Sequence, residues 1–153
     1  MPARIGTEQM RDLIGQESEP SSWFQLTQER VDQFADVTND HQFIHVDPEK
    51  AATTELGGTI AHGYFLLSLL PHLLGEMSSL PAGLAVKINY GSNRVRFLNP
   101  VRVGSLVRAR QKIVAVSERS SGVWRVETEA VLELKDEARP ALVAELITLV
   151  FAD

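Results

Sequence analysis

The second half of the chain alternates between apolar and polar residues with a period of two. The alternation runs through residues 84–90, 94–97, 106–113 and 125–134. Successive side chains of a strand point to opposite faces, so this pattern predicts strands with one buried face. Asn99-Pro100 and Val103-Gly104 bracket a turn. Residues 141–151 are more continuously apolar, which predicts a central or interface strand.

The first half carries helical signals instead. A short strand is expected at residues 21–26. Apolar positions between residues 31 and 38 then recur at the i, i+3, i+4 and i+7 spacing of an amphipathic helix. Thr27 is its expected N-cap, and Asn39 marks its expected end.

Two further helices are predicted before the strands begin. Asp47 and Pro48 suit the start of a short helix over residues 48–55, which Gly57-Gly58 ends. Thr59 is expected to cap a helix running from residue 60 to about residue 74 that is apolar nearly all round, as is typical of a buried helix. Pro71 lacks an amide hydrogen and should loosen its last turn.

Helices followed by strands predict an α+β fold, with helices packed against an antiparallel sheet of five or more strands. The length of 153 residues suits one domain with a sizeable core. No repeat, low-complexity tract or long linker divides the chain. We therefore expect a single domain over residues 1–153.

Composition and charge narrow the classes of function. The net charge of −5 disfavours nucleic acid and anionic membranes as partners. The absence of cysteine excludes disulfides, thiolate nucleophiles and Cys-ligated zinc. The apolar run from Tyr64 to Leu74 is shorter than the roughly 20 residues that span a bilayer, and residues 1–15 lack the apolar stretch of a signal peptide. We expect a cytoplasmic protein.

Asp40 and His45 are the first candidates for chemistry. A carboxylate near an imidazole can orient a water molecule and move its protons. On a helix, five residues place two side chains roughly 140° apart, and on a strand they fall on opposite faces. The pair can therefore converge only if residues 40–45 form an irregular loop between two helices. The alternative is that Asp40 caps the next segment and His45 is an ordinary histidine.

Gly63 is the second candidate. The first turn of a helix has amide groups without intrahelical partners and a positive dipole end, which can stabilise an oxygen that gains negative charge. A glycine there lets a ligand approach the backbone. The alternative is that Gly63 only permits tight packing of a buried helix.

Together these segments resemble the MaoC-like dehydratases, the (R)-specific enoyl-CoA hydratases (hydratase type 2) of the hot-dog fold. The family pattern Gly-Asp-x-Asn-Pro-[Leu/Ile/Val]-His-x5-[Ala/Ser] stands at residues 39–45 as Asn-Asp-His-Gln-Phe-Ile-His, with Ala51 at its end. The family's Ala-His-Gly stands at residues 61–63, 23 residues from Asp40 to the glycine. Residues 96–101 resemble the strand end Arg-Phe-x-x-Pro-Val. The similarity runs from about residue 20 onward and is nearest the NodN-like single-domain branch.

The resemblance implies reversible hydration of a trans-2-enoyl-CoA to an (R)-3-hydroxyacyl-CoA on a sheet wrapped around a buried central helix. It implies no metal and no cofactor besides the coenzyme A of the substrate, and a homodimer. Asp40 and His45 would hold the catalytic water, and the Gly63 amide would bind the thioester oxygen. The acyl chain would lie along the central helix, at residues such as Tyr64, Leu67 and Leu70. Substrate-binding roles are expected for Gln42, Ile60, His62, Tyr64, Arg94 and Arg96.

The chain departs from the family pattern at three positions of the loop. Asn39 replaces glycine, Gln42 replaces asparagine and Phe43 replaces proline. Gln42 is one methylene longer than the residue that helps to position the water. The candidates for binding the CoA phosphates are, besides Arg94 and Arg96, Arg108, Arg110 and Lys112.

Two other functions fit the same resemblance. Thioesterases of this fold commonly use an acidic residue on or near the central helix, but residues 60–74 contain none and Glu76 comes late. A non-catalytic acyl-binding subunit would account for the altered positions 42 and 43, whereas the intact Asp40 and His45 argue against it.

Overall fold

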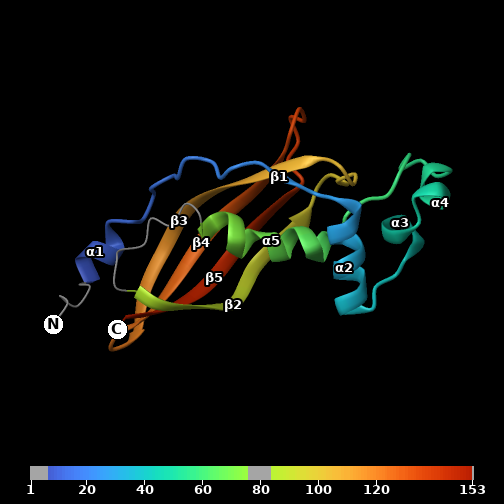
Figure 1. Ribbon diagram of the computed structural model, residues 1–153. Helices are drawn as coiled ribbons and strands as arrows, with labels where there is room; N and C mark the ends of the chain where they lie inside the picture. The colour runs from blue at the N-terminus through green and yellow to red at the C-terminus, as the bar shows by residue number, and fades with distance from the viewer. Residues whose placement is uncertain (1–6, 76–83, 153) are drawn as a thin grey trace.

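The computed structural model describes residues 7–75 and 84–152. Five antiparallel strands form one curled sheet in the order β1-β3-β4-β5-β2, and helix α5 crosses one of its faces (Figure 1). This confirms the α+β class and the wrapped-sheet arrangement. The elements are α1 (Thr7–Arg11), β1 (Phe24–Gln25), α2 (Gln28–Thr38), α3 (Phe43–Val46), α4 (Pro48–Ala52), α5 (Gly63–Gly75), β2 (Leu84–Phe97), β3 (Leu106–Ser120), β4 (Val123–Leu134) and β5 (Leu142–Ala152).

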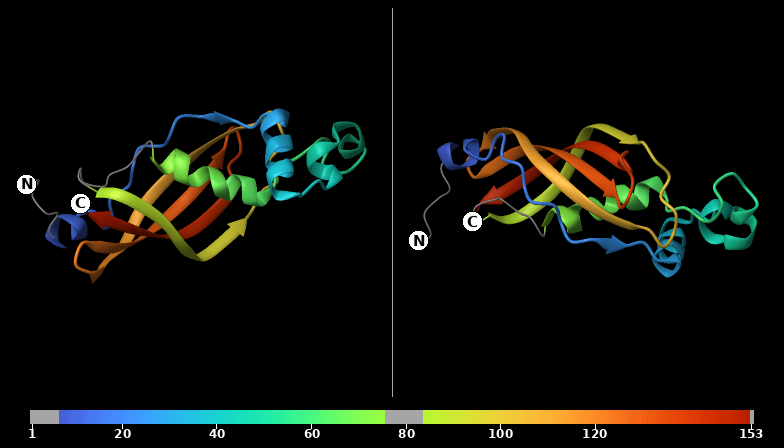
Figure 2. Two further views of the ribbon diagram at one scale, coloured as in Figure 1. Left: turned by 60° about the horizontal axis from the view of Figure 1, so that its bottom comes forward. Right: turned by 90° about the horizontal axis from the view of Figure 1, so that it is seen from above.

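The main core lies between α5 and the concave face of the sheet. One stripe of the helix is buried at Phe65, Leu66, Leu69, Leu70 and Leu73. The stripe packs against small and branched residues of β3, β4 and β5, which leaves room for the helix inside the curl (Figure 2). The sheet residues in this core are Val107, Ala109, Ala130, Leu132, Leu134, Leu142 and Ala144.

The prediction that the central helix is buried on every side was wrong. Tyr64 is 72% exposed, and Ser68 and Pro71 are also exposed. The helix lies on one face of a single sheet, so only the stripe that faces the sheet is covered. Its outer side is left partly apolar, and Pro71 is accommodated inside the helix.

Helix α5 also begins three residues later than expected, because residues 59–62 are extended. Ile60 forms a β-bridge with Arg102, and the amide of Ala61 donates to the carbonyl of Val101 over 2.8 Å. Thr59 does not cap the helix: its hydroxyl donates to Oε1 of Gln28 over 2.6 Å. These contacts fix the approach to the helix before its first turn.

The helices ahead of α5 follow the sequence more closely. Thr27 caps α2 by accepting the Arg30 amide, and Asn39 ends it in a left-handed conformation with φ 56°. Asp47 caps α4, with Pro48 at the first position. Helix α4 stops at Ala52 rather than at residue 55. Where an irregular loop was predicted, residues 40–42 are irregular and residues 43–46 form the short helix α3.

A second cluster of buried residues lies where α1, which the sequence did not predict, packs on the far end of the concave face (Figure 1). Met10 of α1 and Leu13 just after it contact the strands there, at Ile113, Trp124, Val126 and Val150. The sheet is therefore covered by two helices at different points along its length.

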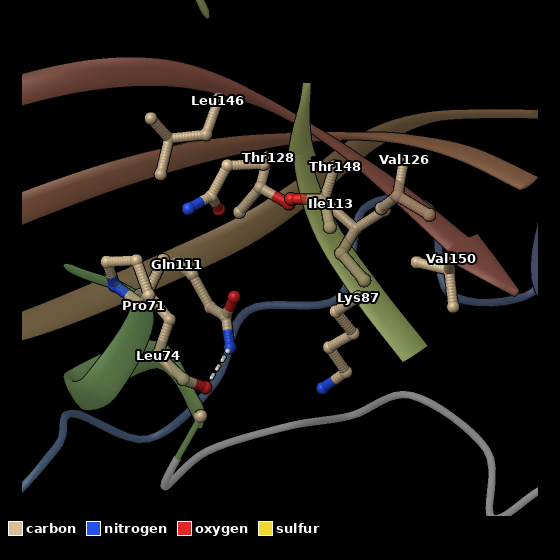
Figure 3. A pocket seen from close by; sticks show the side chains of 12 residues that line it. Pro71, Leu74, Lys87, Gln111, Ile113, Val126, Thr128, Leu146, Thr148 and Val150 are labelled. Carbon is tan, nitrogen blue, oxygen red and sulfur yellow. Dashed lines mark hydrogen bonds between the residues drawn. The ribbon is translucent and has the colours of Figure 1, made fainter. Parts of the chain in front are cut away.

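A cavity of about 230 Å³ opens between the C-terminal end of α5 and the concave face (Figure 3). Its apolar lining includes Leu74, Ile113, Val126, Leu146 and Val150. Its polar lining includes Asn89, Gln111, Thr128 and Thr148. An adjoining cavity of about 380 Å³ shares Pro71, Asn89, Leu146 and Thr148 with it and extends to Leu67 and Ser68. Together they form a groove along α5.

Strand β2 lies at the edge of the sheet and carries large apolar side chains in the open. Val86, Ile88, Tyr90 and Phe97 are all about half exposed. Bulges interrupt its pairing with β5 at three points. No helix of the described residues is long and apolar enough to cross a membrane.

Candidate active site

Asp40 lies just past the end of α2, in a loop that the left-handed Asn39 turns back on the helix. The Asp40 amide donates to the carbonyl of Ala35 over 3.1 Å, which closes the helix end. Its carboxylate is 53% exposed, and Oδ1 accepts the amide of Gln42 at 3.4 Å. The carboxylate is thus positioned by backbone contacts while one side of it faces solvent.

His45 projects from α3 and is 6% exposed. Its Nδ1 lies 2.7 Å from the carbonyl oxygen of Ile60. A carbonyl can only accept, so Nδ1 carries the proton and, in the neutral ring, Nε2 is the acceptor. Gln28 of α2 donates to the His45 carbonyl over 2.7 Å and holds the short helix in place. The tautomer of His45 is therefore set by the extended segment before α5.

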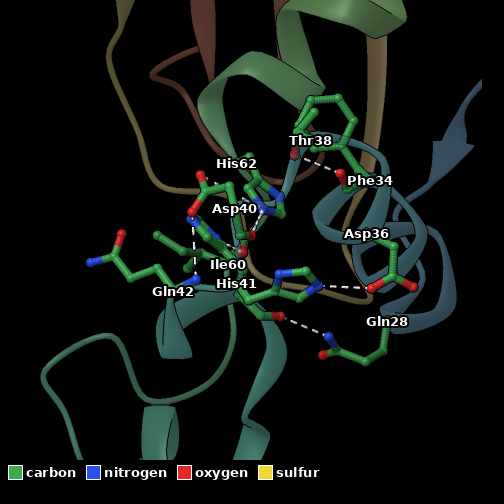
Figure 4. Close-up of polar contacts among 10 residues, drawn as sticks. Gln28, Phe34, Asp36, Thr38, Asp40, His41, Gln42, Ile60 and His62 are labelled. Atoms are coloured by element: carbon green, nitrogen blue, oxygen red, sulfur yellow. Dashed lines mark hydrogen bonds and ion pairs between the residues drawn. The ribbon is translucent and has the colours of Figure 1, made fainter.

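His62 directly precedes α5, and its side chain lies next to Asp40 (Figure 4). Its ring stacks on His45 with the centroids 3.8 Å apart and the planes at 22°, and it contacts Phe34 on α2. Nε2 lies 3.0 Å from the carbonyl oxygen of Asp40 and 4.0 Å from its carboxylate. The side chain is 3% exposed. His62 is therefore buried against Asp40 and His45, and its expected contact with substrate stays a prediction.

The surroundings of His45 lower its pKa below the ordinary 6.5. Burial is the largest cause, because it disfavours the charged ring, and the nearby His62 acts in the same direction. The hydrogen bond to Ile60 and the Asp40 carboxylate raise the pKa, but by less. At neutral pH the ring is accordingly neutral, and Nε2 can accept a proton.

The structure brings Asp40, His45 and His62 together, with one donor atom of each within 4.8 Å of the others. Such a set can bind a metal ion in principle. The two imidazoles are stacked, however, so their in-plane lone pairs lie in neighbouring, nearly parallel planes. This arrangement does not favour a common ion and suits proton transfer better.

Gly63 begins α5 directly after His62, so the free amide groups of the helix start beside the stacked imidazoles. A Cβ added at Gly63 would lie 3.1 Å from the Phe97 ring, closer than ordinary contact. Tyr64 meets the same ring edge to face at 6.0 Å. The glycine therefore lets the edge strand β2 approach the helix start.

Gln42 and Ile60 act through their backbones in this structure. The Gln42 amide meets Asp40 as described, while its side chain extends away from the other residues of the group (Figure 4). Ile60 gives its carbonyl to His45, and its amide donates to the Ile44 carbonyl over 2.9 Å. Their expected contacts with substrate stay predictions.

The basic residues of the strands do not converge on this group. Arg94 and Arg96 lie opposite Glu145 and Val143 in register, on the face of the sheet away from α5. Arg108 and Arg110 bind Glu133 through 2.6 Å contacts on that face. Burial would raise the pKa of Glu133, but its hydrogen bonds with the two arginines lower it. Lys112 lies opposite Glu129.

The groove beside α5 was missed by sequence reasoning. Its walls come from alternating positions of four strands, and nothing in the linear pattern shows where α1 and α5 leave the sheet uncovered. The residues expected to contact the acyl chain differ accordingly. Leu67 lines the groove, whereas Leu70 is fully buried in the core. Thr128 and Thr148 point into the cavity at the C-terminal end of α5 (Figure 3).

Residues 9–134 match the model of the MaoC-like domain, and the chain belongs to this dehydratase family. It is 47% identical over 143 residues to 3-hydroxyacyl-thioester dehydratase Z of Mycobacterium tuberculosis (strain CDC 1551 / Oshkosh), covering 92% of this chain and 94% of that protein. Nodulation protein N of Rhizobium leguminosarum bv. viciae is 43% identical, with 92% and 88% covered.

A solved structure supports the same assignment. The (R)-hydratase from A. caviae involved in PHA biosynthesis has a TM-score of 0.70 and 27% sequence identity, with 88% of this chain and 94% of that chain covered. The fold is thus that of the hot-dog hydratases, and the family is one of hydro-lyases acting on thioesters.

Proposed function

We propose that the protein catalyses the reversible hydration of a trans-2-enoyl thioester to an (R)-3-hydroxyacyl thioester, with coenzyme A as the carrier. The observation that carries the proposal is the convergence of the Asp40 carboxylate with a His45 ring whose Nδ1 is bound to Ile60. Nε2 is then the nitrogen available for proton transfer. Dehydratase Z and the A. caviae (R)-hydratase support the two directions of the reaction by name.

In the hydration direction, the water oxygen forms a bond to C3 of the enoyl group. One water proton passes to Asp40 or His45, and a proton from this pair is added to C2, so one water is consumed overall. Negative charge develops on the thioester oxygen meanwhile. The first amides of α5, beginning with Gly63, would stabilise this charge as an oxyanion site.

The groove along α5 provides a place for the acyl chain. It starts near Leu67, one helical turn beyond the first residues of α5, and continues to Leu74. Its wall is mainly apolar, which suits a hydrocarbon chain. With the thioester held at the helix start, the length of the acyl chain would determine how far it reaches along the groove.

Two copies of the chain would complete the site region through β2. This long edge strand exposes backbone groups and the large apolar side chains of Val86, Ile88 and Tyr90, and its Phe97 lies against Gly63. Such edges invite pairing with another strand. In such a dimer, Arg94 and Arg96 of one copy would be solvent-exposed close to the other copy. There they could bind the CoA phosphates. A dimeric mass by light scattering, converted to a monomeric mass by Ile88→Glu, is expected; a monomeric wild type at micromolar concentration would contradict the pairing.

The thioesterase alternative finds no support in α5, since none of the residues 63–75 is acidic. Glu76 lies outside the described residues. Hydrolysis would release free thiol, which hydration does not, so the two reactions are separated by one assay.

The deciding experiment follows the ultraviolet absorbance of the enoyl thioester during incubation with crotonyl-CoA and with a longer trans-2-enoyl-CoA. Wild type should remove the absorbance without thiol release and give the (R)-alcohol on a chiral column. Asp40→Asn should lose the activity, whereas His41→Gln, an exposed neighbour in the same loop that binds Asp36, should keep it. No loss of absorbance with either substrate would overturn the proposal.

A further inference from the structure

The side chain of His62 has features that packing in the core does not explain. The ring is 3% exposed, and its Nδ1 has no hydrogen-bond partner among the residues that the structure describes. An unpaired buried polar atom destabilises a fold, so an apolar side chain would serve packing better. Two neighbours of this ring, Asp40 and His45, belong to the proposed reaction.

Each of these neighbours meets a different part of the imidazole. Nε2 donates to the Asp40 carbonyl over 3.0 Å, because that oxygen can only accept. The face of the ring covers His45 at 3.8 Å between centroids. Phe34, stacked on Phe65 of the core, backs the ring from α2. The imidazole thus connects Asp40 of the loop and His45 of α3 to Phe34, which packs against the core.

We infer that His62 is a positioning residue that sets the separation of Asp40 and His45, holding the first through the backbone carbonyl and the second through the stacked ring. This rests on the proposed function for its catalytic consequence. The His62 side chain is 3% exposed, so its assigned role is to act through its two neighbours. The two contacts are separable: an amide side chain can keep the donor, and a phenyl ring can keep the stack.

The ring also shields one side of His45 from water, and burial is the main reason that the His45 pKa is low. Two helices around His45 carry charged groups. Helix α2 has Glu29, Arg30, Asp32 and Asp36, of which Asp32 and Asp36 bind Gln28 and His41, and helix α4 has Glu49 at its start. Helix α4 offers Lys50, which lies over the Phe43 ring, and its cap Asp47. Asp40 and His62 are the ionisable groups that act on the pKa of His45 itself.

Two variants separate the contacts. His62→Phe keeps the ring over His45 and removes the donor to Asp40. Its kcat should fall about fivefold to tenfold, as for one lost hydrogen bond, and its acidic limb should move less than in His62→Gln, because the burial of His45 is kept and only the charge effect of His62 is lost. His62→Gln keeps a donor and removes the stack; the His45 pKa should rise toward its ordinary value, and the acidic limb of the kcat profile should move to higher pH. The exposed His41→Gln is the matched control and should change neither.

Imidazole NMR titration measures the His45 pKa without substrate, and the chain has only four histidines to assign. An unmoved His45 signal in His62→Gln together with unchanged kcat in His62→Phe would overturn the inference. If both variants fail to fold, the wild-type tautomers decide: His62 protonated at Nδ1 instead of Nε2 would also overturn it. If wild type shows no turnover but the His45 pKa is shifted in His62→Gln, the proposed reaction is refuted and the coupling of the two rings is upheld.

Discussion

The two ends of α5 differ in how firmly their side chains are held. At the N-terminal end, backbone carbonyls of Ile60 and Asp40 hold the rings of His45 and His62, and the rings stack on each other. At the C-terminal end, side chains of four strands surround a cavity, and Thr128 and Thr148 merely face into it. From Gly63 to Leu74 the helix advances about 16 Å.

The difference teaches how one helix can serve two purposes. Proton transfer requires fixed tautomers and distances, so it depends on backbone groups, which a point substitution does not remove. Selection among chains requires only space and surface, so it depends on side chains that can change without disturbing the fold. Substitutions at the first end should alter rate for every substrate, and those at the second should alter preference.

The largest effect is expected at the pair that moves protons. Asp40→Asn and His45→Gln should each lower kcat by about 10² to 10⁴, the usual contribution of acid–base groups. The glutamine at position 45 can still donate to the Ile60 carbonyl, so the helix should stay in place. Rates with short and long enoyl-CoA should fall by the same factor. A loss under about 100-fold, or one confined to long chains, would contradict these roles.

A smaller loss is expected when the helix start is crowded. In Gly63→Ala the new methyl would press on Phe97, whose ring carbons lie 3.1 Å from the Cβ position. Displacement of the first amides should reduce kcat by about tenfold or more, short of the 10²–10³ seen when an oxyanion donor is removed. Phe97→Leu should restore much of the rate in the double variant. Failure to restore it would mean that the methyl excludes the substrate itself.

The far end of the helix should respond only to long substrates. Thr148→Phe would fill part of the 230 Å³ cavity, and kcat/KM for a long enoyl-CoA should fall about tenfold, the scale on which pockets discriminate by size. Crotonyl-CoA, which is too short to reach the cavity, is the control on the same variant. Equal loss for both substrates would show that the two ends are not separate.

The sequence predicted one end of α5 far better than the other. Asp40 and His45 are five residues apart in the chain, so their meeting follows from the helix breaks on either side of them. The burial of His62 could not be predicted from the sequence, because it depends on Phe34, which packs from a different helix. The cavity depends on where α1 and α5 cross the sheet, and α5 was expected to be buried on all sides because the pattern of a helix does not show which side is covered.

The smallest effect is expected from pH acting on stability at the fixed end. The pKa of His45 is lower in the folded protein than its ordinary 6.5, so the unfolded chain binds a proton more readily. The contribution of neutral His45 to the free energy of unfolding is therefore complete above pH 6.5. It is lost as the pH falls from there through the pKa of the folded state. Melting temperatures of wild type and His45→Gln, measured from pH 8 to pH 5 by circular dichroism, should converge toward acid, because the variant lacks this group. Parallel curves for wild type and His45→Gln would show that His45 does not titrate differently in the folded and unfolded states, and the acidic limb of the kcat profile would then need another group.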